Sequence, residues 1–251
     1  MRYRFIDCRY DLMEPPNGRA AYRAGHIPGA AFADLDGDLS DLTHAPAAGR
    51  HPLPTAAGFA ASAGRLGIDA DTFVVAYDDG VNGGAARLWW LLRHFGHDAV
   101  AVLAGGIDAW IGPLETGDAE VEPASFTPRE RDDDTITADE LYARLGDRRL
   151  AIVDARGAAR FAGAPSDDPR AKLDPVAGHI PGAVNMPYAD DAAPSAELLA
   201  ADEIVVYCGS GVTACVPLLA IYAAGRTDVR LYPGSWSEWS RRGLPAETGP
   251  G

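Results

Sequence analysis

The sequence predicts an α/β fold with two related domains, each a mainly parallel sheet flanked by helices. The hexapeptide GHIPGA occurs twice, at Gly25–Ala30 and at Gly178–Ala183. An apolar strand at Thr72–Gly80 is matched by another at Asp202–Ser210, and a glycine-rich turn and an apolar helical stretch follow both. Val- and Ile-rich runs alternate with helical patterns, which is typical of βαβ units and a parallel sheet. The spacing of the copies is too long for a small structural repeat and indicates a duplicated domain.

The composition limits the class of protein. Of the 251 residues, 47% are hydrophobic and 23% are charged, which excludes an intrinsically disordered chain. The 22 Lys and Arg and the 36 Asp and Glu residues give a net charge of −14, which argues against a nucleic-acid partner. No apolar run reaches the length of about 18 residues that a membrane-spanning helix needs, and the N-terminal residues do not resemble a secretory signal. We therefore expect a cytoplasmic protein without a membrane partner.

The first predicted domain covers residues 1–112. Its first strand is expected at Phe5–Asp7, and the apolar run within Thr72–Gly80 predicts a buried strand. An apolar helix follows at Ala86–His97, and the stretch Val100–Trp110 begins with a further short strand.

The second predicted domain covers residues 135–251, after a linker at 113–134 that is rich in Pro, Gly, Glu and Asp. Its buried strands are expected at Ala151–Ala155, Ile204–Cys208 and Val229–Tyr232. Its helices are expected at Thr137–Leu145, Thr213–Ala224 and Ser235–Arg241.

Cys208 is the candidate nucleophile because it ends a buried strand and precedes a tight turn into a helix. Ligands of open α/β sheets bind beyond the carboxyl ends of strands. A turn containing Gly209 and Gly211 can direct several backbone N–H groups at one point, so we expect a thiolate there. The same donors would stabilise a second sulfur carried on Cys208, because a persulfide is also anionic. Cys8 and Cys215 are interpreted as structural thiols. No cysteines are spaced as CxxC, so no structural zinc site is predicted.

The run CGSGVTA that starts at Cys208 resembles the loop of the rhodanese-type sulfurtransferases, in particular the 3-mercaptopyruvate sulfurtransferases. The duplicated GHIPGA, ARLWWLLRHFGH, LAGGIDAW, VDAR and the C-terminal EW extend this resemblance over nearly the whole chain. It implies two rhodanese-like domains of which only the second is catalytic. Asp78 in YDDG stands where the first copy would need its cysteine, and a carboxylate cannot accept sulfur.

The resemblance implies that a sulfur atom moves from 3-mercaptopyruvate through a Cys208 persulfide to cyanide or a thiol, such as thioredoxin or a small thiol, with release of pyruvate. No metal or organic cofactor is implied. Ala214 occupies the position where related phosphatases need an arginine, so phosphate hydrolysis is disfavoured. Gly209 and Ser210 lack the cations of the CRKG loop of thiosulfate enzymes, which favours mercaptopyruvate. Thiosulfate as the donor, a sulfur-carrier or redox-sensing module, and a degenerate scaffold remain alternatives.

The resemblance also implies a substrate-binding set. The loop residues are Gly209, Gly211, Val212 and Thr213. The cations that would bind the donor's carboxylate are Arg160, in a GRF-like motif with Ala159 in place of the glycine, and Arg170, with Lys172 as a rival. Arginine suits this role because its planar guanidinium binds a carboxylate through two parallel hydrogen bonds.

Proton transfer is assigned by the resemblance to Ser210, His51 and Asp36. In this arrangement the aspartate orients the imidazole, the histidine moves the proton and the serine connects it to the substrate. Asp34, Asp38 and His44 are nearby alternatives to Asp36 and His51. The histidines of the two GHIPGA motifs, His26 and His179, are interpreted as structural because they occur in the active and the silent copy alike.

Overall fold

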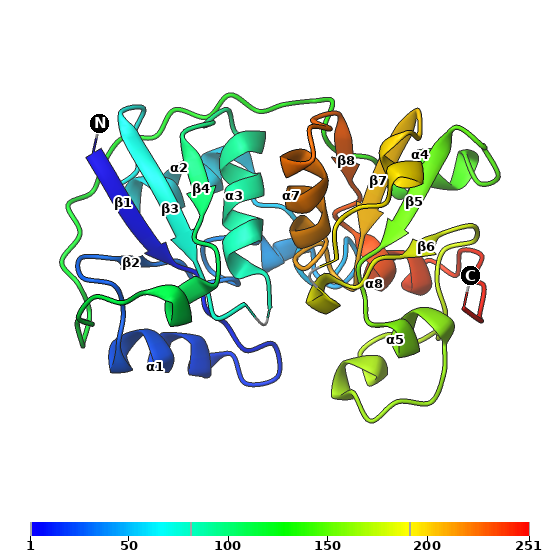
Figure 1. Cartoon of the computed structure of the whole chain (residues 1–251), viewed down its shortest axis with the longest axis horizontal. Helices are drawn as coiled ribbons and strands as arrows, with labels where there is room; N and C mark the ends of the chain where they lie inside the picture. The colour runs from blue at the N-terminus through cyan, green and yellow to red at the C-terminus, as the bar shows by residue number, and fades with distance from the viewer. Residues whose placement is uncertain (1, 81, 191, 251) are drawn as a thin grey trace. The chain divides into compact units, whose positions relative to one another are not determined.

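The computed structural model describes residues 2–80, 82–190 and 192–250, which divide into two compact units (Figure 1). The first unit contains Met1–Asp41 and Leu53–Arg131, and the second contains Leu42–Pro52 and Asp132–Gly251. Each unit has a four-stranded sheet in which every strand pair is parallel, which confirms the predicted α/β fold class. Within the described ranges, no helix is long and apolar enough to cross a membrane.

The first unit has the strand order β2-β1-β3-β4. Its strands are β1 (Arg2–Asp7), β2 (Ala31–Phe32), β3 (Thr72–Tyr77) and β4 (Val100–Val102), and its helices are α1 (Pro16–Ala24), α2 (Ala56–Arg65) and α3 (Gly84–His94). The short 3-10 helix η2 (Gly106–Ala109) follows β4. The apolar helix α3 packs against β3 and β4, as Figure 1 shows.

The second unit repeats this arrangement in the order β6-β5-β7-β8. Its strands are β5 (Leu150–Asp154), β6 (Val184–Asn185), β7 (Glu203–Tyr207) and β8 (Val229–Leu231). Its helices are α4 (Ala138–Ala143), α5 (Ala158–Ala162), α6 (Ala196–Leu199), α7 (Cys215–Ala223) and α8 (Ser235–Arg241), with 3-10 turns η1 (Leu42–His44), η3 (Pro169–Lys172) and η4 (Tyr188–Asp190). Helix α7 packs against β7 and β8, the counterpart of α3 in the first unit.

The predicted elements are present, with shifts of up to three residues at their ends, as at the start of β1 and the end of α3. Helix α8 has the predicted bounds, whereas α7 begins two residues later than predicted. The carbonyls of Val212 and Thr213 accept hydrogen bonds from the Cys215 and Val216 amides in a tight turn before the helix. The glycine-rich loop therefore extends further into the predicted helix than its apolar pattern suggests.

For two segments, the position in the sequence does not show to which unit they belong. The predicted linker is hydrogen-bonded to the first unit up to Arg131, whose amide donates to the His94 carbonyl at 2.8 Å. Leu42–Pro52 groups instead with the second unit, where the Arg50 amide donates to Ser237 Oγ at 3.0 Å. His51 is therefore part of the unit that contains Cys208, although it precedes most of the first unit in the chain.

A buried ion pair connects the end of β5 to the second GHIPGA motif. Arg156 is paired with Asp154 through its Nε and Nη2 atoms, and both side chains are almost completely buried. Arg156 Nη2 also donates to the Gly178 carbonyl at 2.7 Å. The guanidinium carbon lies 4.7 Å from the centre of the Trp236 ring. A buried charge is tolerated only when it is paired and hydrogen-bonded, and this pair meets both conditions.

The first unit contains the same connection. Arg9 pairs with the buried Asp7 and donates to the carbonyl of Gly25, the first glycine of the first GHIPGA motif, at 2.7 Å. His26 Nδ1 lies 3.0 Å from the Tyr22 carbonyl, and His179 Nδ1 lies 2.8 Å from that of Phe161. The two motifs are thus held by equivalent local contacts, as their structural interpretation predicted.

Helix α4 begins with a capping box, in which Thr137 and Glu140 bond to each other's backbone amides, and a prediction about stability follows from it. Thr137 Oγ1 accepts from the Glu140 amide at 3.2 Å, and the Glu140 carboxylate accepts from the Thr137 amide at 2.8 Å. We expect Thr137→Ala to lower the free energy of unfolding of the second unit by about 1 kcal/mol. The hydrogen bonds that its carboxylate accepts from the Thr137 amide and hydroxyl lower the pKa of Glu140. The contribution of this carboxylate is therefore present above the ordinary glutamate pKa and is lost as pH falls through the lowered value.

Chemical denaturation at neutral pH measures this change. The exposed Thr227, which caps no helix, supplies the control, since Thr227→Ala is expected to stay within a few tenths of a kcal/mol of the parent protein. Equal effects of the two substitutions would show that the cap is not stabilising.

Candidate active site

The loop after β7 is fixed to the first turn of α8 by backbone hydrogen bonds. The Cys208 amide donates to Ser235 Oγ at 3.1 Å. The Cys208 carbonyl accepts from the Trp236 amide, and the Gly209 carbonyl accepts from the Ser237 amide, both at 3.0 Å. Both the amide and the carbonyl of the candidate nucleophile are therefore engaged, which holds the Cys208 backbone in one orientation.

Cys208 is buried, with an exposed fraction of 1% for the whole residue, and its sulfur receives a hydrogen bond from the Gly211 amide at 3.2 Å. Several donors were expected, and among the residues that the structure describes, the Gly211 amide is the one that donates to the sulfur. Gly211 has φ +79°, and a Cβ at this position would lie 2.5 Å from the Pro233 carbonyl oxygen. Only glycine can therefore present its amide to the sulfur from this position. Val212 and Thr213 contribute their carbonyls to the turn that leads into α7.

Ser210 and His51 lie together although 159 residues separate them. Ser210 Oγ is 2.8 Å from His51 Nδ1, and each residue is only 6% exposed. This distance allows a proton to pass between the hydroxyl and the imidazole. His44, the sequence alternative, is exposed at the end of η1 and accepts the Ala48 amide through its carbonyl.

The three aspartates considered as partners of His51 belong to the first unit. Asp34 Oδ1 accepts the amides of Asp36 and Gly37, and Asp38 Oδ2 accepts the Asp34 amide. Burial, assisted by the Asp34 carboxylate, raises the pKa of Asp36. The pairing of Asp36 with His51 stays a prediction.

The two predicted substrate arginines have different surroundings. Arg160 is 11% exposed and its Nη2 lies 3.2 Å from Asp174 Oδ2. Burial and the neighbouring Arg156 cation lower the pKa of Arg160. Arg170 pairs with Asp168 at 2.8 Å and donates to the Tyr188 hydroxyl at 2.8 Å, and the Asp168 hydrogen bond raises its pKa. The rival cation, Lys172, is exposed.

Sequence reasoning missed three residues near Arg160, namely Asp174 and the two further arginines that contact it, Arg50 and Arg241. Arg50 forms a close ion pair with Asp174, whose side chain is 4% exposed. Arg241 Nη1 lies 3.7 Å from the same carboxylate. Arg50 could have been noticed as a cation next to His51 in an acidic chain. Asp174 has no comparable signal, because 124 residues separate it from Arg50.

In the first unit, Asp78 stands where the second unit has Cys208, and its carboxylate is hydrogen-bonded to nearby backbone amides. Its carboxylate accepts the Gly80 amide at 2.8 Å and the Ala85 amide at 2.9 Å, and burial raises its pKa. The Gly80 amide before α3 and the Ala85 amide in its first turn thus bind an internal carboxylate rather than a sulfur. Burial also raises the pKa of Cys8 well above its ordinary value, which favours the unreactive thiol form.

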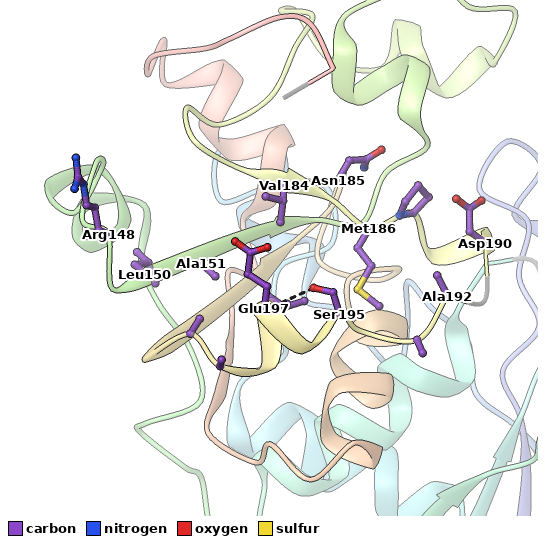
Figure 2. Close-up of a pocket in the computed structure, with 15 residues that line it drawn as sticks. Arg148, Leu150, Ala151, Val184, Asn185, Met186, Asp190, Ala192, Ser195 and Glu197 are labelled. Atoms are coloured by element: carbon purple, nitrogen blue, oxygen red, sulfur yellow. Dashed lines mark hydrogen bonds between the residues drawn. The ribbon is translucent and has the colours of Figure 1, made fainter.

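The second unit also has a cavity whose lining does not include Cys208, Ser210 or His51. It has a volume of about 700 Å³, and Figure 2 shows Asn185, Met186, Ser195 and Glu197 around it. Its lining has neither a cysteine nor a histidine. Among the residues that the structure describes, no cluster of three His, Cys, Asp or Glu side chains could hold a metal ion. The chemistry of the Cys208 loop, and not cavity size, therefore marks the candidate site.

Comparison with known families agrees with this fold and loop. The model of the rhodanese-like domain matches residues 2–112 and again 137–242. The chain therefore belongs to the rhodanese family.

Similar proteins indicate its place in that family. A Pseudomonas aeruginosa relative, provisionally named 3-mercaptopyruvate sulfurtransferase, is 42% identical over 254 residues, covering 93% of this chain and 88% of the relative. A Mycobacterium tuberculosis relative, provisionally named thiosulfate sulfurtransferase SseB, is 41% identical over 262 residues, covering 94% and 87%. The crystal structure of SseA from Escherichia coli, described as a 3-mercaptopyruvate sulfotransferase, superposes with a TM-score of 0.78 at 33% identity, covering 93% and 92%. The chain is accordingly a tandem-domain sulfurtransferase, as the CGSGVTA loop predicted.

Proposed function

We propose that the protein transfers a sulfur atom from 3-mercaptopyruvate to a thiol or to cyanide through a persulfide on Cys208. The hydrogen bond from the Gly211 amide to the Cys208 sulfur supports this proposal most directly. A backbone amide next to a sulfur stabilises an anion there, both the attacking thiolate and the persulfide that replaces it.

The reaction has two steps. The Cys208 thiolate attacks the sulfur of mercaptopyruvate, the C–S bond breaks, and its electron pair leaves with the carbon as the enolate of pyruvate. A proton then converts the enolate to pyruvate, and Ser210 with His51 provides a route for that proton. In the second step an acceptor thiolate attacks the outer sulfur and releases the Cys208 thiolate.

The acceptor and the compartment complete the proposal. A small thiol or reduced thioredoxin suits the second step, since each supplies a thiolate. The three cysteines are free thiols, in keeping with a reducing cytoplasm.

Pyruvate release and protein mass test the proposal together. We expect the wild-type protein to release pyruvate from mercaptopyruvate and, without an acceptor, to gain about +32 Da, the mass of one sulfur atom. Addition of a thiol should remove this mass. Absence of both pyruvate and the adduct would refute the proposal, whereas an adduct formed only with a partner desulfurase would favour a sulfur carrier.

Thiosulfate is the second candidate donor because the Mycobacterium tuberculosis relative is named for it. Transfer from thiosulfate releases sulfite and needs no proton on carbon.

We expect Ser210→Ala to lower kcat/KM for mercaptopyruvate about a hundredfold and to change kcat/KM for thiosulfate much less. Steady-state kinetics with both donors measures this difference. An equal loss with both donors would contradict the proton route through Ser210.

A further inference from the structure

Gly209, the residue directly after Cys208, faces two guanidinium groups. A Cβ at Gly209 would lie 2.8 Å from Nη2 of Arg50 and 3.0 Å from Nη2 of Arg160. Real Cβ atoms are very rarely found this close to other heavy atoms. A side chain at this position would therefore displace the two arginines, and the absence of one allows both cations to approach the loop.

Arg50, whose Nη2 atom lies next to Gly209, has a hydrogen-bond donor without a partner among the described residues. Its Nη1 atom is taken by Asp174. Its Nε atom is buried and has no hydrogen-bond partner among the described residues. Nε and Nη2 form one edge of the planar guanidinium, the edge that binds a carboxylate through two parallel bonds. A buried donor without a partner is unfavourable, so an oxyanion placed at this edge gains a hydrogen bond that the free protein lacks.

Asp174 positions the two arginines without neutralising them. Its carboxylate contacts Arg50, lies 3.2 Å from Arg160 and lies 3.7 Å from Arg241. One negative charge among three guanidinium groups leaves the region cationic within a chain of net charge −14. Local cations of this kind are needed to attract an anionic donor against the field of the whole protein.

We infer that Arg50 is a substrate-binding residue that, together with Arg160, binds the anionic group of the sulfur donor beside Cys208. The cations that the sequence of the loop lacks at Gly209 and Ser210 are thus supplied by arginines from outside the loop. Arg170, in contrast, is held by Asp168 and Tyr188. The role of this anion site as a donor site rests on the proposed function, but the site itself can be tested without turnover.

Alkylation of Cys208 by two matched reagents tests the anion site. Iodoacetate and iodoacetamide have the same leaving group, and in both cases the thiolate displaces iodide and forms a thioether. They differ in that only iodoacetate carries a negative charge. The ratio of the two rates at Cys208, followed by peptide mass mapping, therefore reports attraction of the anion. A change in thiol reactivity or in folding alters both rates and leaves the ratio unchanged.

We expect Arg50→Ala to lower the ratio of the iodoacetate rate to the iodoacetamide rate at least about tenfold, because one charge-assisted hydrogen-bond pair is lost. Arg50→Lys should give an intermediate ratio, since it keeps the charge but not the planar edge. Arg230→Ala is the matched control, because Arg230 also forms an ion pair in the second unit, with Glu203 at 3.0 Å. Its ratio should equal that of the wild type.

Three results would overturn the inference. The first is an unchanged ratio in Arg50→Ala, and the second is a fall in Arg170→Ala without one in Arg50→Ala. The third is a wild-type Cys208 that iodoacetate does not modify. If instead the ratio depends on Arg50 but the wild type releases no pyruvate from mercaptopyruvate, the anion site stands and the proposed donor is wrong.

Discussion

Cys208→Ser is expected to abolish pyruvate release, with a loss of at least about a thousandfold in kcat/KM. A hydroxyl at neutral pH is a far weaker nucleophile than a thiolate, and it cannot carry a persulfide. The variant should also gain no sulfur mass when it is incubated with mercaptopyruvate. Because serine is close to cysteine in size, the backbone contacts of the loop with Ser235 and Trp236 should persist.

The matched control is Cys8→Ala, which removes the buried thiol of the first unit. This thiol lies 3.7 Å from the Ile6 carbonyl and has a raised pKa because of burial. We expect the variant to form the adduct on Cys208 and to turn over. Adduct formation in Cys208→Ser, or its loss in a folded Cys8→Ala protein, would contradict the assignment of the nucleophile.

Arg156→Ala is expected to destabilise the second unit by about 3–5 kcal/mol. The substitution leaves the Asp154 carboxylate buried without its cation and removes the donor to the Gly178 carbonyl. It also removes the guanidinium that stacks on Trp236, whose amide holds the Cys208 carbonyl. Chemical denaturation combined with hydrogen exchange over residues 132–250 measures the loss in this unit.

A double substitution separates the unpaired charge from the lost packing. Asp154→Ala with Arg156→Met removes both charges, so we expect it to recover much of the stability lost in Arg156→Ala. Arg230→Ala serves as the control, since its ion pair with Glu203 is partly exposed and worth little. A change within about 0.5 kcal/mol for Arg156→Ala would show that the buried pair is not needed.

The architecture could be predicted because its signals are local and occur twice. The GHIPGA motif follows a strand that ends in Asp-x-Arg in each copy, at Asp7 and at Asp154, and the same contacts form in both units. Apolar runs of strand length identified β3 and β7 because buried parallel strands are apolar on both faces. The start of α7 could not be predicted as accurately, because hydrogen bonds of the turn at Val212 and Thr213 decide where the helix begins.

The sequence by itself determined the duplicated fold, the sulfurtransferase family and Cys208 as the candidate nucleophile, because each depends on neighbouring residues in the chain. It also placed Ser210 and His51 in one site, and their side chains lie 2.8 Å apart, while their joint role in proton transfer stays a prediction. Only the tertiary structure decided that Leu42–Pro52 groups with the second unit and that Arg50 meets Arg160 at one carboxylate. An ion pair between residues far apart in the chain leaves no periodicity or motif, because it arises only when the folded backbone brings the two side chains together.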